Sequence, residues 1–420
     1  MSEKVKTRAG VVYPYLSSFA HLAKDRLSET VALGAAIDLD IAYCSSIRLR
    51  KINAAAFFGK GMQDTLRDII TRESIALLIV DADLSPIQQR NLEKGLNVKI
   101  IDRTALILEI FGERARTKEG SLQVELAHLT YQRSRLVRSW THLERQRGGA
   151  GFLGGPGETQ IELDRRIIDD KIVKIKKELE KIKQTRGLQR RSRQKVPYPI
   201  VALVGYTNAG KSTLFNYLTH ADVFAKDLLF ATLDTTMRRL VLPSKREVIF
   251  SDTVGFISDL PHELIMAFRA TLEEVLEADI ILQVIDASNP SHAKQRNNVL
   301  EVLHHLGLER IEHQKNYIEV YNKSDLLTQN NLKSSSHGLY ISALSGAGIK
   351  ELLEKIDAIL SENHQEINLD IPAGDGKTLA WLYRNAEIIS LKNQDDKVFI
   401  RARMSRENIA KLQGLKRNSE

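Results

Sequence analysis

The chain has 420 residues, of which 43% are hydrophobic and 27% are charged. This composition is ordinary for packed globular domains and excludes a largely disordered protein, and the length suggests about three domains. The single cysteine, Cys44, excludes an internal disulfide framework and fits a reducing compartment. No signal-peptide-like stretch and no run of about 18 apolar residues occurs, so we expect a soluble, cytoplasmic protein with no membrane span.

The net charge of +8 is concentrated in one segment of the chain. Residues 114–195 contain 21 Lys and Arg against 10 Asp and Glu, a net of +11, whereas the rest carries 40 against 43, a net of −3. A local basic excess attracts polyanions such as RNA through counterion release. A solvated helix face would account for the same charges, so the excess alone does not decide between the two.

The N-terminal part, residues 1–113, alternates short β-rich runs with helical patterns, which predicts an α/β domain with parallel strands. The predicted strands are 55–58, 75–80 and 98–101, and the predicted helices are 62–72, 86–95 and 104–114. This domain has no recognisable phosphate-binding loop and no other pattern typical of an active site.

Residues 114–196 predict a basic, antiparallel helical hairpin. Two apolar stripes follow the 4,3 spacing of paired helices, and each arm of about 30 residues would be roughly 40 Å long. Arg133 interrupts the first stripe and Arg165 the second. The stripes are Leu122, Leu126, Leu129, Leu136, Trp140 and Leu143, then Ile161, Ile168, Ile172, Ile175, Leu179 and Ile182.

The connector of the hairpin, residues 148–157, has six glycines in ten residues, although one glycine at a helix C-cap would suffice. One interpretation is a flexible turn. The other is a tip whose backbone approaches a partner closely, with apolar side chains that meet the partner or stack on RNA bases. The second interpretation predicts RNA contacts from Gly149, Gly151, Phe152, Leu153, Gly154, Gly155 and Gly157.

Residues 197–362 carry the motifs of a P-loop GTPase domain, a doubly wound α/β fold with a mostly parallel sheet. A buried strand at 200–204 feeds a GxxxxGKS loop, which opens a helix at 212–218. Backbone N–H groups of such a loop surround phosphates at a helix N-terminus. We expect Lys211 to reach the β- and γ-phosphates and Ser212 to ligate Mg²⁺. The predicted loop contacts are Gly205, Tyr206, Thr207, Asn208, Ala209, Gly210, Lys211 and Ser212.

Three further elements follow this loop in the order that GTP binding requires. After a strand at 248–250, Asp252 is expected to hold Mg²⁺ through water and the Gly255 N–H to contact the γ-phosphate. After a strand at 280–285 and another at 318–321, Asp325 is placed to accept two hydrogen bonds from guanine, which adenine cannot donate. The predicted contacts are Asp252, Thr253, Val254 and Gly255, then Asn322, Lys323, Ser324 and Asp325, and the backbone of Ser342, Ala343 and Leu344.

The first switch is expected within the run Phe230, Ala231, Thr232, Leu233, Asp234, Thr235 and Thr236. One threonine of this run should ligate Mg²⁺ when GTP is bound, and the run itself leaves Thr232, Thr235 and Thr236 open.

Two residues bear on catalysis, besides Lys211 and Gly255. Phe256 stands where many small GTPases place a glutamine that orients the attacking water, so we expect slow hydrolysis unless a partner or ion supplies that function. Phe256 is equally suited to a place in the core. Asn208 in the phosphate loop resembles the asparagine of GTPases in which K⁺ bridges the phosphates. The alternative is a loop-shaping residue that bonds its own backbone.

The last part, residues 363–420, predicts a small α/β module. Its predicted strands are 386–391 and 397–402, and its predicted helices are 377–384 and 405–412.

The chain resembles HflX-type ribosome-associated GTPases of the Obg–HflX branch, over all four parts. The matching motifs are 88–94 (QQRNLEK), 154–160 (GGPGETQ), 230–234 (FATLD), 252–261 (DTVGFISDLP) and 267–274 (AFRATLEE). The resemblance implies binding to the large ribosomal subunit, with the hairpin near the peptidyl-transferase region, and it places the Mg²⁺-ligating threonine at Thr232. The family's tip usually carries an arginine, whereas this chain has Phe152, Leu153 and Gly154, which removes one phosphate contact.

The leading hypothesis is a monomeric GTPase that the large subunit stimulates and that splits or rescues stalled or idle ribosomes, or acts in their biogenesis. A second hypothesis is an assembly or anti-association factor in which hydrolysis only resets occupancy. A third is an RNA-remodelling enzyme that uses ATP through the N-terminal domain. A tRNA-modifying role is disfavoured by the motifs of the tip and the first switch.

Overall fold

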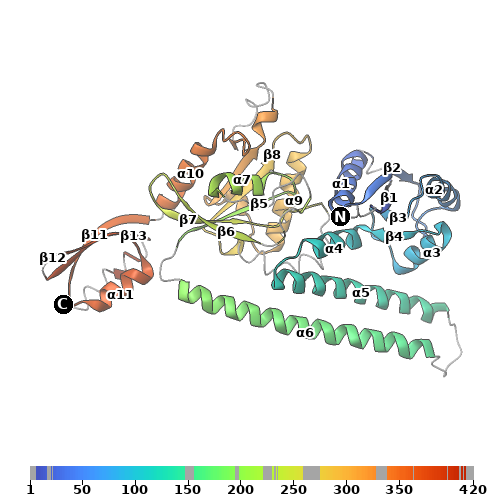
Figure 1. Cartoon of the computed structure of the whole chain (residues 1–420), viewed down its shortest axis with the longest axis horizontal. Coiled ribbons are helices and arrows are strands. Elements are labelled where there is room, and N and C mark those ends of the chain that lie inside the picture. The colour runs from blue at the N-terminus through green and yellow to red at the C-terminus, as the bar shows by residue number, and fades with distance from the viewer. Residues whose placement is uncertain are drawn as a thin grey trace, which may run out of the picture. The chain divides into compact units, whose positions relative to one another are not determined.

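The computed structural model describes residues 6–16, 20, 22–146, 156–193, 198–220, 229–230, 233, 235–258, 275–327, 338–362, 364–394, 396–405, 408–409 and 411–412 (Figure 1). The chain forms two compact units. Unit 1 contains residues 1–179, 226–234 and 259–268, and unit 2 contains residues 180–225, 235–258 and 269–420.

Unit 1 begins with a four-stranded parallel sheet in the order β2-β1-β3-β4, as expected for an α/β domain. Its strands are β1 (Arg8–Leu16), β2 (Asp40–Leu49), β3 (Leu77–Val80) and β4 (Lys99–Asp102). Its helices are α1 (Ala23–Ala36), α2 (Lys60–Arg72), α3 (Pro86–Leu96) and α4 (Arg103–Arg114). The predictions of α2, α3, α4, β3 and β4 are confirmed, whereas β1 and β2 were not predicted.

The predicted strand at 55–58 is wrong, because this segment is a turn. The Asn53 side chain accepts hydrogen bonds from the backbone N–H groups of Ala55 and Ala56, at 2.8 and 3.1 Å, and an isolated bridge joins Asn53 to Phe57. Asparagine commonly closes turns in this way. Phe57 and Phe58 are buried in the core of the domain, so burial rather than strand pairing explains the apolar run.

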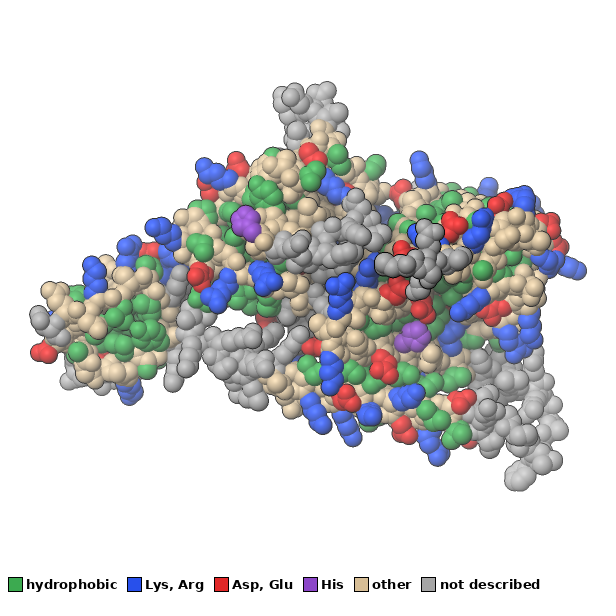
Figure 2. All heavy atoms as spheres, viewed as in Figure 1, with side chains coloured by type: hydrophobic (Ala, Val, Ile, Leu, Met, Phe, Trp, Pro, Cys, Tyr) green, Lys and Arg blue, Asp and Glu red, His purple; other side chains and the backbone are tan. Residues whose placement is uncertain are grey.

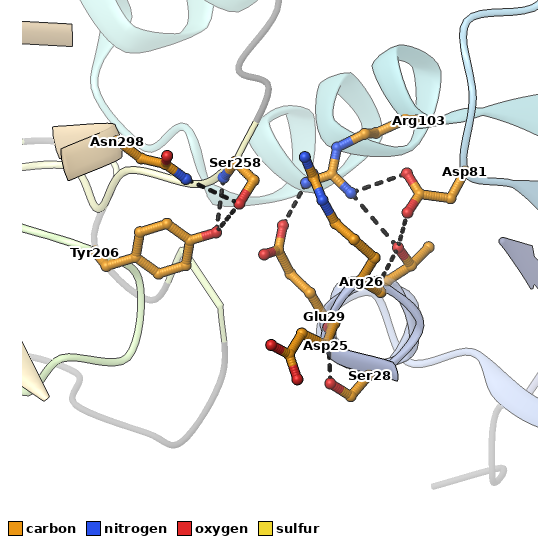
Figure 3. Close-up of polar contacts among 10 residues, drawn as sticks. Asp25, Arg26, Ser28, Glu29, Asp81, Arg103, Tyr206, Ser258 and Asn298 are labelled. Carbon is orange, nitrogen blue, oxygen red and sulfur yellow. Dashed lines mark hydrogen bonds and ion pairs between the residues drawn. The ribbon is translucent and has the colours of Figure 1, made fainter. Parts of the chain in front are cut away.

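A buried charge cluster joins three elements at the carboxyl end of this sheet (Figure 3). The Arg103 guanidinium at the start of α4 donates to Asp81 at 2.9 Å and also pairs with Glu29 of α1. The Thr30 hydroxyl donates to the other oxygen of Asp81 at 2.7 Å. Burial lowers the pKa of Arg103, but the two carboxylates together raise it by a larger amount, so the pKa lies above its ordinary value. Each charge therefore has the partners that a buried ion requires.

The predicted helical hairpin is formed by α5 (Lys118–Gln146) and α6 (Pro156–Arg193). The two apolar stripes pack together through Leu122, Leu126 and Leu129 of α5 and Ile168, Ile172, Ile175 and Leu179 of α6. The interruptions of the stripes also meet, because Arg133 pairs with Asp169 at 2.8 Å and Arg165 lies 3.9 Å from the same carboxylate. Residues 148–155 of the tip lie outside the described residues, and Gly157 lies in α6.

The hairpin is attached to the N-terminal sheet through Asp102, a fully buried residue at the end of β4. Its carboxylate caps α4 by accepting the Ala105 N–H at 2.8 Å. It also accepts the Tyr131 hydroxyl and the Arg135 guanidinium of α5, each at 2.9 Å. Burial, followed by the Asp102 charge, raises the pKa of Tyr131, so this phenol stays a hydrogen-bond donor.

Unit 2 contains a six-stranded sheet in the order β10-β9-β8-β5-β7-β6, parallel except for the β6–β7 pair. This is the doubly wound, mostly parallel fold that the motifs predict. Its strands are β5 (Ile200–Gly205), β6 (Thr236–Val241), β7 (Glu247–Asp252), β8 (Ile280–Asp286), β9 (Tyr317–Asn322) and β10 (Leu339–Tyr340). Its helices include α7 (Lys211–Thr219), α9 (His292–His305) and α10 (Ile349–Glu362).

The C-terminal module contains an antiparallel sheet in the order β11-β13-β12 and the helix α11 (Gly376–Asn385). Its strands are β11 (His364–Pro372), β12 (Glu387–Gln394) and β13 (Lys397–Ser405). The predictions of α11, β12 and β13 are confirmed, and β11 was not predicted. Of the helix predicted at 405–412, Ser405 ends β13 instead, and residues 408–409 and 411–412 are helical. None of the helices in the described part of the chain has the length and hydrophobicity needed to cross a bilayer.

Candidate nucleotide-binding site

The phosphate loop joins the end of β5 to the start of α7, and two of its glycines are required by their surroundings. Gly205 has φ of 153°, and a Cβ there would collide with the Val284 carbonyl of β8. Gly210 has φ of 91°, and a Cβ there would collide with the Asn322 side-chain amide. Only glycine combines such backbone angles with so close an approach. The loop is thereby held at the N-terminus of α7, where backbone N–H groups favour anions.

Lys211 is buried beneath this loop, and its ammonium group is fixed by two carbonyls. Its Nζ donates to the Gly205 oxygen at 3.1 Å and to the Tyr206 oxygen at 2.8 Å. Burial lowers the pKa of Lys211 to about 8, although the charge of Asp252 acts in the opposite direction. The group is therefore largely charged at neutral pH, and a phosphate beside it would replace the solvation that burial removes.

The residues predicted to hold Mg²⁺ from this side of the site are in contact with each other. The Ser212 hydroxyl donates to a carboxylate oxygen of the fully buried Asp252 at 2.7 Å. Oxygen donors of this kind suit Mg²⁺, which keeps water and substrate phosphates in its shell rather than using an all-protein cage. No group of three or more His, Cys, Asp or Glu within the described ranges could enclose a metal. A bound Mg²⁺ would neutralise charge on the phosphates.

The segments predicted to recognise the base are joined to the phosphate loop by Asn322. Its amide donates to the Ala209 carbonyl at 2.9 Å, and its side-chain oxygen accepts the Ala343 N–H at 2.9 Å. Asp325 accepts the Ser342 hydroxyl and remains exposed. Lys323 pairs with Asp286 at the end of β8, at 2.8 Å. The phosphate loop and both base-recognition segments are thus brought to one edge of the sheet, with the Asp325 carboxylate accessible to a guanine edge.

Gly255 lies against the phosphate loop, as its predicted contact with the γ-phosphate requires. A Cβ there would lie 2.8 Å from the Thr207 methyl group and 3.0 Å from Lys211 Nζ. The next residue, Phe256, is only 2% exposed, so its place in the core is confirmed. Its phenyl ring carries no polar atom with which to orient water, and the two interpretations of Phe256 hold together.

Asn208 has φ of 60° and an exposed side chain. Asparagine adopts this left-handed backbone region more readily than most residues. The loop-shaping interpretation of Asn208 therefore has a structural basis, and the potassium interpretation stays a prediction.

Some residues of the predicted first switch are described, whereas others, and most residues of the tip, lie outside the described residues. Phe230 and Leu233 are buried within unit 1, where the Phe230 ring packs edge-to-face on Phe111 at 4.6 Å. Ala231, Thr232, Asp234 and the tip residues Gly149, Gly151, Phe152, Leu153, Gly154 and Gly155 lie outside the described residues. Two further residues, which the motifs did not predict, adjoin the site: Ser258 contacts Tyr206 of the phosphate loop, and Asn298 contacts Ser258. Only Ser258 had a signal, since it belongs to the 252–261 motif.

The sheet, the phosphate loop and the base-recognition segments define a P-loop GTPase. Four family matches cover the chain in order: "GTP-binding GTPase N-terminal" at 24–112, "GTP-binding GTPase Middle Region" at 114–193, "50S ribosome-binding GTPase" at 200–323 and "HflX C-terminal domain" at 327–417. The chain belongs to the HflX family of GTPases.

Two relatives illustrate the similarity. The chain is 46% identical over 392 residues to the GTPase HflX of Magnetococcus marinus, covering 92% of this chain and 90% of that protein. It is 44% identical over 335 residues to the GTPase HflX of Escherichia coli, covering 78% and 77%. Among solved structures, SsGBP in complex with GDP aligns with a TM-score of 0.47 at 23% identity, covering 85% of this chain and 99% of that chain.

Proposed function

We propose that this GTPase binds the large ribosomal subunit through its hairpin, and that it splits or rescues stalled or idle ribosomes in the cytoplasm. The observation that carries the proposal is the basic face of α6. Lys174 and Lys177 are exposed on the side of α6 turned away from the apolar stripe that packs on α5, and Lys171 is exposed at the edge of that stripe. Figure 2 shows blue Lys and Arg side chains along this helix, with red acidic ones between them.

The family and the charge distribution support the same partner. The family that matches residues 200–323 is described as a 50S ribosome-binding GTPase, and the segment of highest basic excess, residues 114–195, adjoins it. Ribosomal RNA is the polyanion that such a surface would meet. In this proposal the glycine-rich tip, which the family resemblance directs toward the peptidyl-transferase region, makes the close contacts, and α6 supplies the electrostatic attraction.

Hydrolysis in this scheme is slow alone and faster on the subunit. Lys211, Mg²⁺ on Ser212 and Thr232, and the Gly255 N–H would stabilise charge on the transferring phosphoryl group. Phe256 leaves the attacking water without an orienting side chain at its position. We propose that contact with the large subunit supplies or orders the missing group.

The test is co-sedimentation with large subunits in the presence of a non-hydrolysable GTP analogue or of GDP. Lys174→Glu with Lys177→Glu should weaken subunit binding by about tenfold, on the scale of losing a few phosphate contacts. The matched control is Lys350→Glu with Lys355→Glu, which reverses two exposed lysines of α10. Equal effects of the two pairs, or equal binding with GDP and with the analogue, would contradict the proposal.

The assembly or anti-association role is separated by a second measurement on intact ribosomes. If the non-hydrolysable analogue supports splitting as completely as GTP does, hydrolysis serves only to reset the protein. If splitting needs GTP turnover, the role in splitting or rescuing ribosomes is favoured.

A further inference from the structure

The chain after Asp252 is fastened to the phosphate loop by a short backbone junction. β5 and β7 pair in parallel as far as Leu203 and Asp252, and the pairing then resumes one step out of register, between Tyr206 and Phe256. At this junction the Thr207 N–H donates to the Phe256 carbonyl at 2.7 Å, and the Phe256 N–H donates to the Gly205 carbonyl at 3.1 Å. The intervening residues, which include Gly255, therefore form a loop that is anchored at both ends.

A buried side-chain cluster completes this anchor (Figure 3). The Tyr206 hydroxyl lies 2.6 Å from the Ser258 hydroxyl, and it accepts the Ser258 backbone N–H at 2.7 Å. The Asn298 amide of α9 donates to the Ser258 hydroxyl at 3.2 Å. Tyr206 and Ser258 are 5% and 6% exposed, so water competes little for these hydrogen bonds.

The position of this cluster gives it influence over the γ-phosphate site. Ser258 follows Gly255 by three residues, and Tyr206 belongs to the phosphate loop that Lys211 and Asn322 hold in place. The two hydrogen bonds between this phenol and Ser258 therefore fix the exit of the loop that carries Gly255. Gly255 lies close to Thr207 and Lys211. A small movement of this loop would therefore shift the Gly255 N–H relative to the γ-phosphate, whereas the contacts of the α- and β-phosphates would stay the same.

We propose that Tyr206 is a positioning residue for GTP hydrolysis. Its hydroxyl holds Ser258, and through it the Gly255 N–H, in the place where the γ-phosphate is recognised. Asn298 extends the same contact to α9, so that a change in this helix reaches the phosphate site. The proposal depends on the GTPase site alone and is independent of ribosome binding.

The test is Tyr206→Phe, which keeps the packed ring and removes only the hydroxyl. We expect the affinity for a non-hydrolysable GTP analogue to fall by about tenfold, as for the loss of about one net hydrogen bond, with the affinity for GDP within about twofold of wild type. kcat should fall as well, because the lost contact acts on the transferring phosphoryl group. Ser258→Ala should produce the same two effects at smaller size, because it removes the contact between the hydroxyls but keeps the hydrogen bond from the Ser258 N–H to Tyr206. The double variant should be no worse than Tyr206→Phe, since that variant already lacks both hydrogen bonds.

The matched control is Tyr317→Phe, which removes another buried phenol of the same sheet. Tyr317 starts β9, at the opposite end of that strand from Asn322, and its hydroxyl contacts Gln283. This variant should lower the melting temperature but leave the ratio of GTP-analogue to GDP affinity unchanged. An unchanged ratio in both Tyr206→Phe and Ser258→Ala, or equal losses for analogue and GDP, would overturn the proposal. If Tyr206→Phe does not fold, the result for Ser258→Ala decides.

Discussion

The nucleotide site and the helical hairpin use polar residues in opposite ways. In the nucleotide site Lys211, Asp252 and Asn322 are buried, and each is held by named hydrogen bonds to a neighbouring segment. On α6, Lys174 and Lys177 are exposed. The first arrangement fixes the positions of individual polar atoms, whereas the second supplies only a density of charge.

This contrast predicts two kinds of sensitivity. A buried polar group that loses its partner costs the full desolvation penalty, so single substitutions in the nucleotide site should have large and specific effects. Exposed charges are screened and roughly interchangeable, so substitutions on α6 should have small, additive and salt-dependent effects. The glycine-rich tip would be an exception within the hairpin if its backbone contacts the partner, because changes there would then have large and specific effects.

Replacing residues 148–157 by a short serine linker tests whether the hairpin acts by shape as well as charge. We expect this change to abolish subunit splitting and leave GTP affinity intact, because the tip supplies no predicted nucleotide contact. The measurement is ribosome splitting in sucrose gradients, with fluorescent GTP analogue binding as the control. Residual association should weaken steeply as salt rises, because the charges of α6 remain. Splitting at the normal rate by the altered protein would show that charge alone suffices.

Asp325→Asn tests the fixed geometry of the base site. The carboxylate that we predict to face the N1–H and exocyclic amine of guanine becomes an amide with a donor of its own, which should cost about 3 kcal/mol, or roughly a hundredfold in affinity. Xanthosine triphosphate presents an acceptor to the new amide and should be preferred by the variant. Equilibrium binding of both nucleotides to both proteins measures the exchange. Normal GTP binding together with rejection of the xanthine nucleotide would contradict the role of Asp325.

Features encoded in neighbouring residues could be predicted from the sequence, and features formed across the chain could not. The phosphate loop is a local backbone motif, and the hairpin follows from the periodicity of Leu and Ile, including the interruptions that meet at Asp169. The edge strand β2 was missed because its exposed Cys44, Ser46 and Arg48 weaken the apolar pattern. The Tyr206–Ser258–Asn298 cluster joins residues 52 and 40 positions apart, and no local signal marks such contacts.

The burial of Lys211 predicts a pH dependence of nucleotide affinity. Its pKa of about 8 lies below the ordinary value, and bound phosphates would raise it, so nucleotide binding takes up a proton above pH 8. Affinity should therefore fall as pH rises from about 8 to about 9, approaching tenfold per unit. In the nucleotide-free protein, a rise in pH has the opposite kind of effect, because it stabilises the folded state. The unfolded state binds more protons between about pH 8 and about pH 10.5, so the free energy of unfolding rises across that range.

The control for this pH dependence is Lys211→Arg, whose guanidinium keeps its charge over the same range. Its affinity should be lower overall because the guanidinium does not fit the ammonium site, but it should vary little between about pH 7 and about pH 9. Titration of guanine itself is common to both proteins. An equal slope in the two proteins would therefore assign the pH dependence to the nucleotide and not to Lys211.

The smallest effect that we predict concerns Asn208, where local shape and ion binding compete as explanations. Asn208 is exposed and its φ of 60° suits asparagine, which already accounts for its presence in the loop. If its side chain also helps to hold K⁺ beside the phosphates, that ion would neutralise charge on the transferring group, as a cationic finger does. GTP turnover should then be several-fold faster in potassium than in sodium at equal ionic strength, and Asn208→Ala should lose the difference.

A variant that loses activity equally in both salts would assign Asn208 to loop shape alone. Equal wild-type rates in the two salts, with and without large subunits, would show that K⁺ has no role in hydrolysis. Fast turnover without subunits would show that the catalytic site is complete despite Phe256.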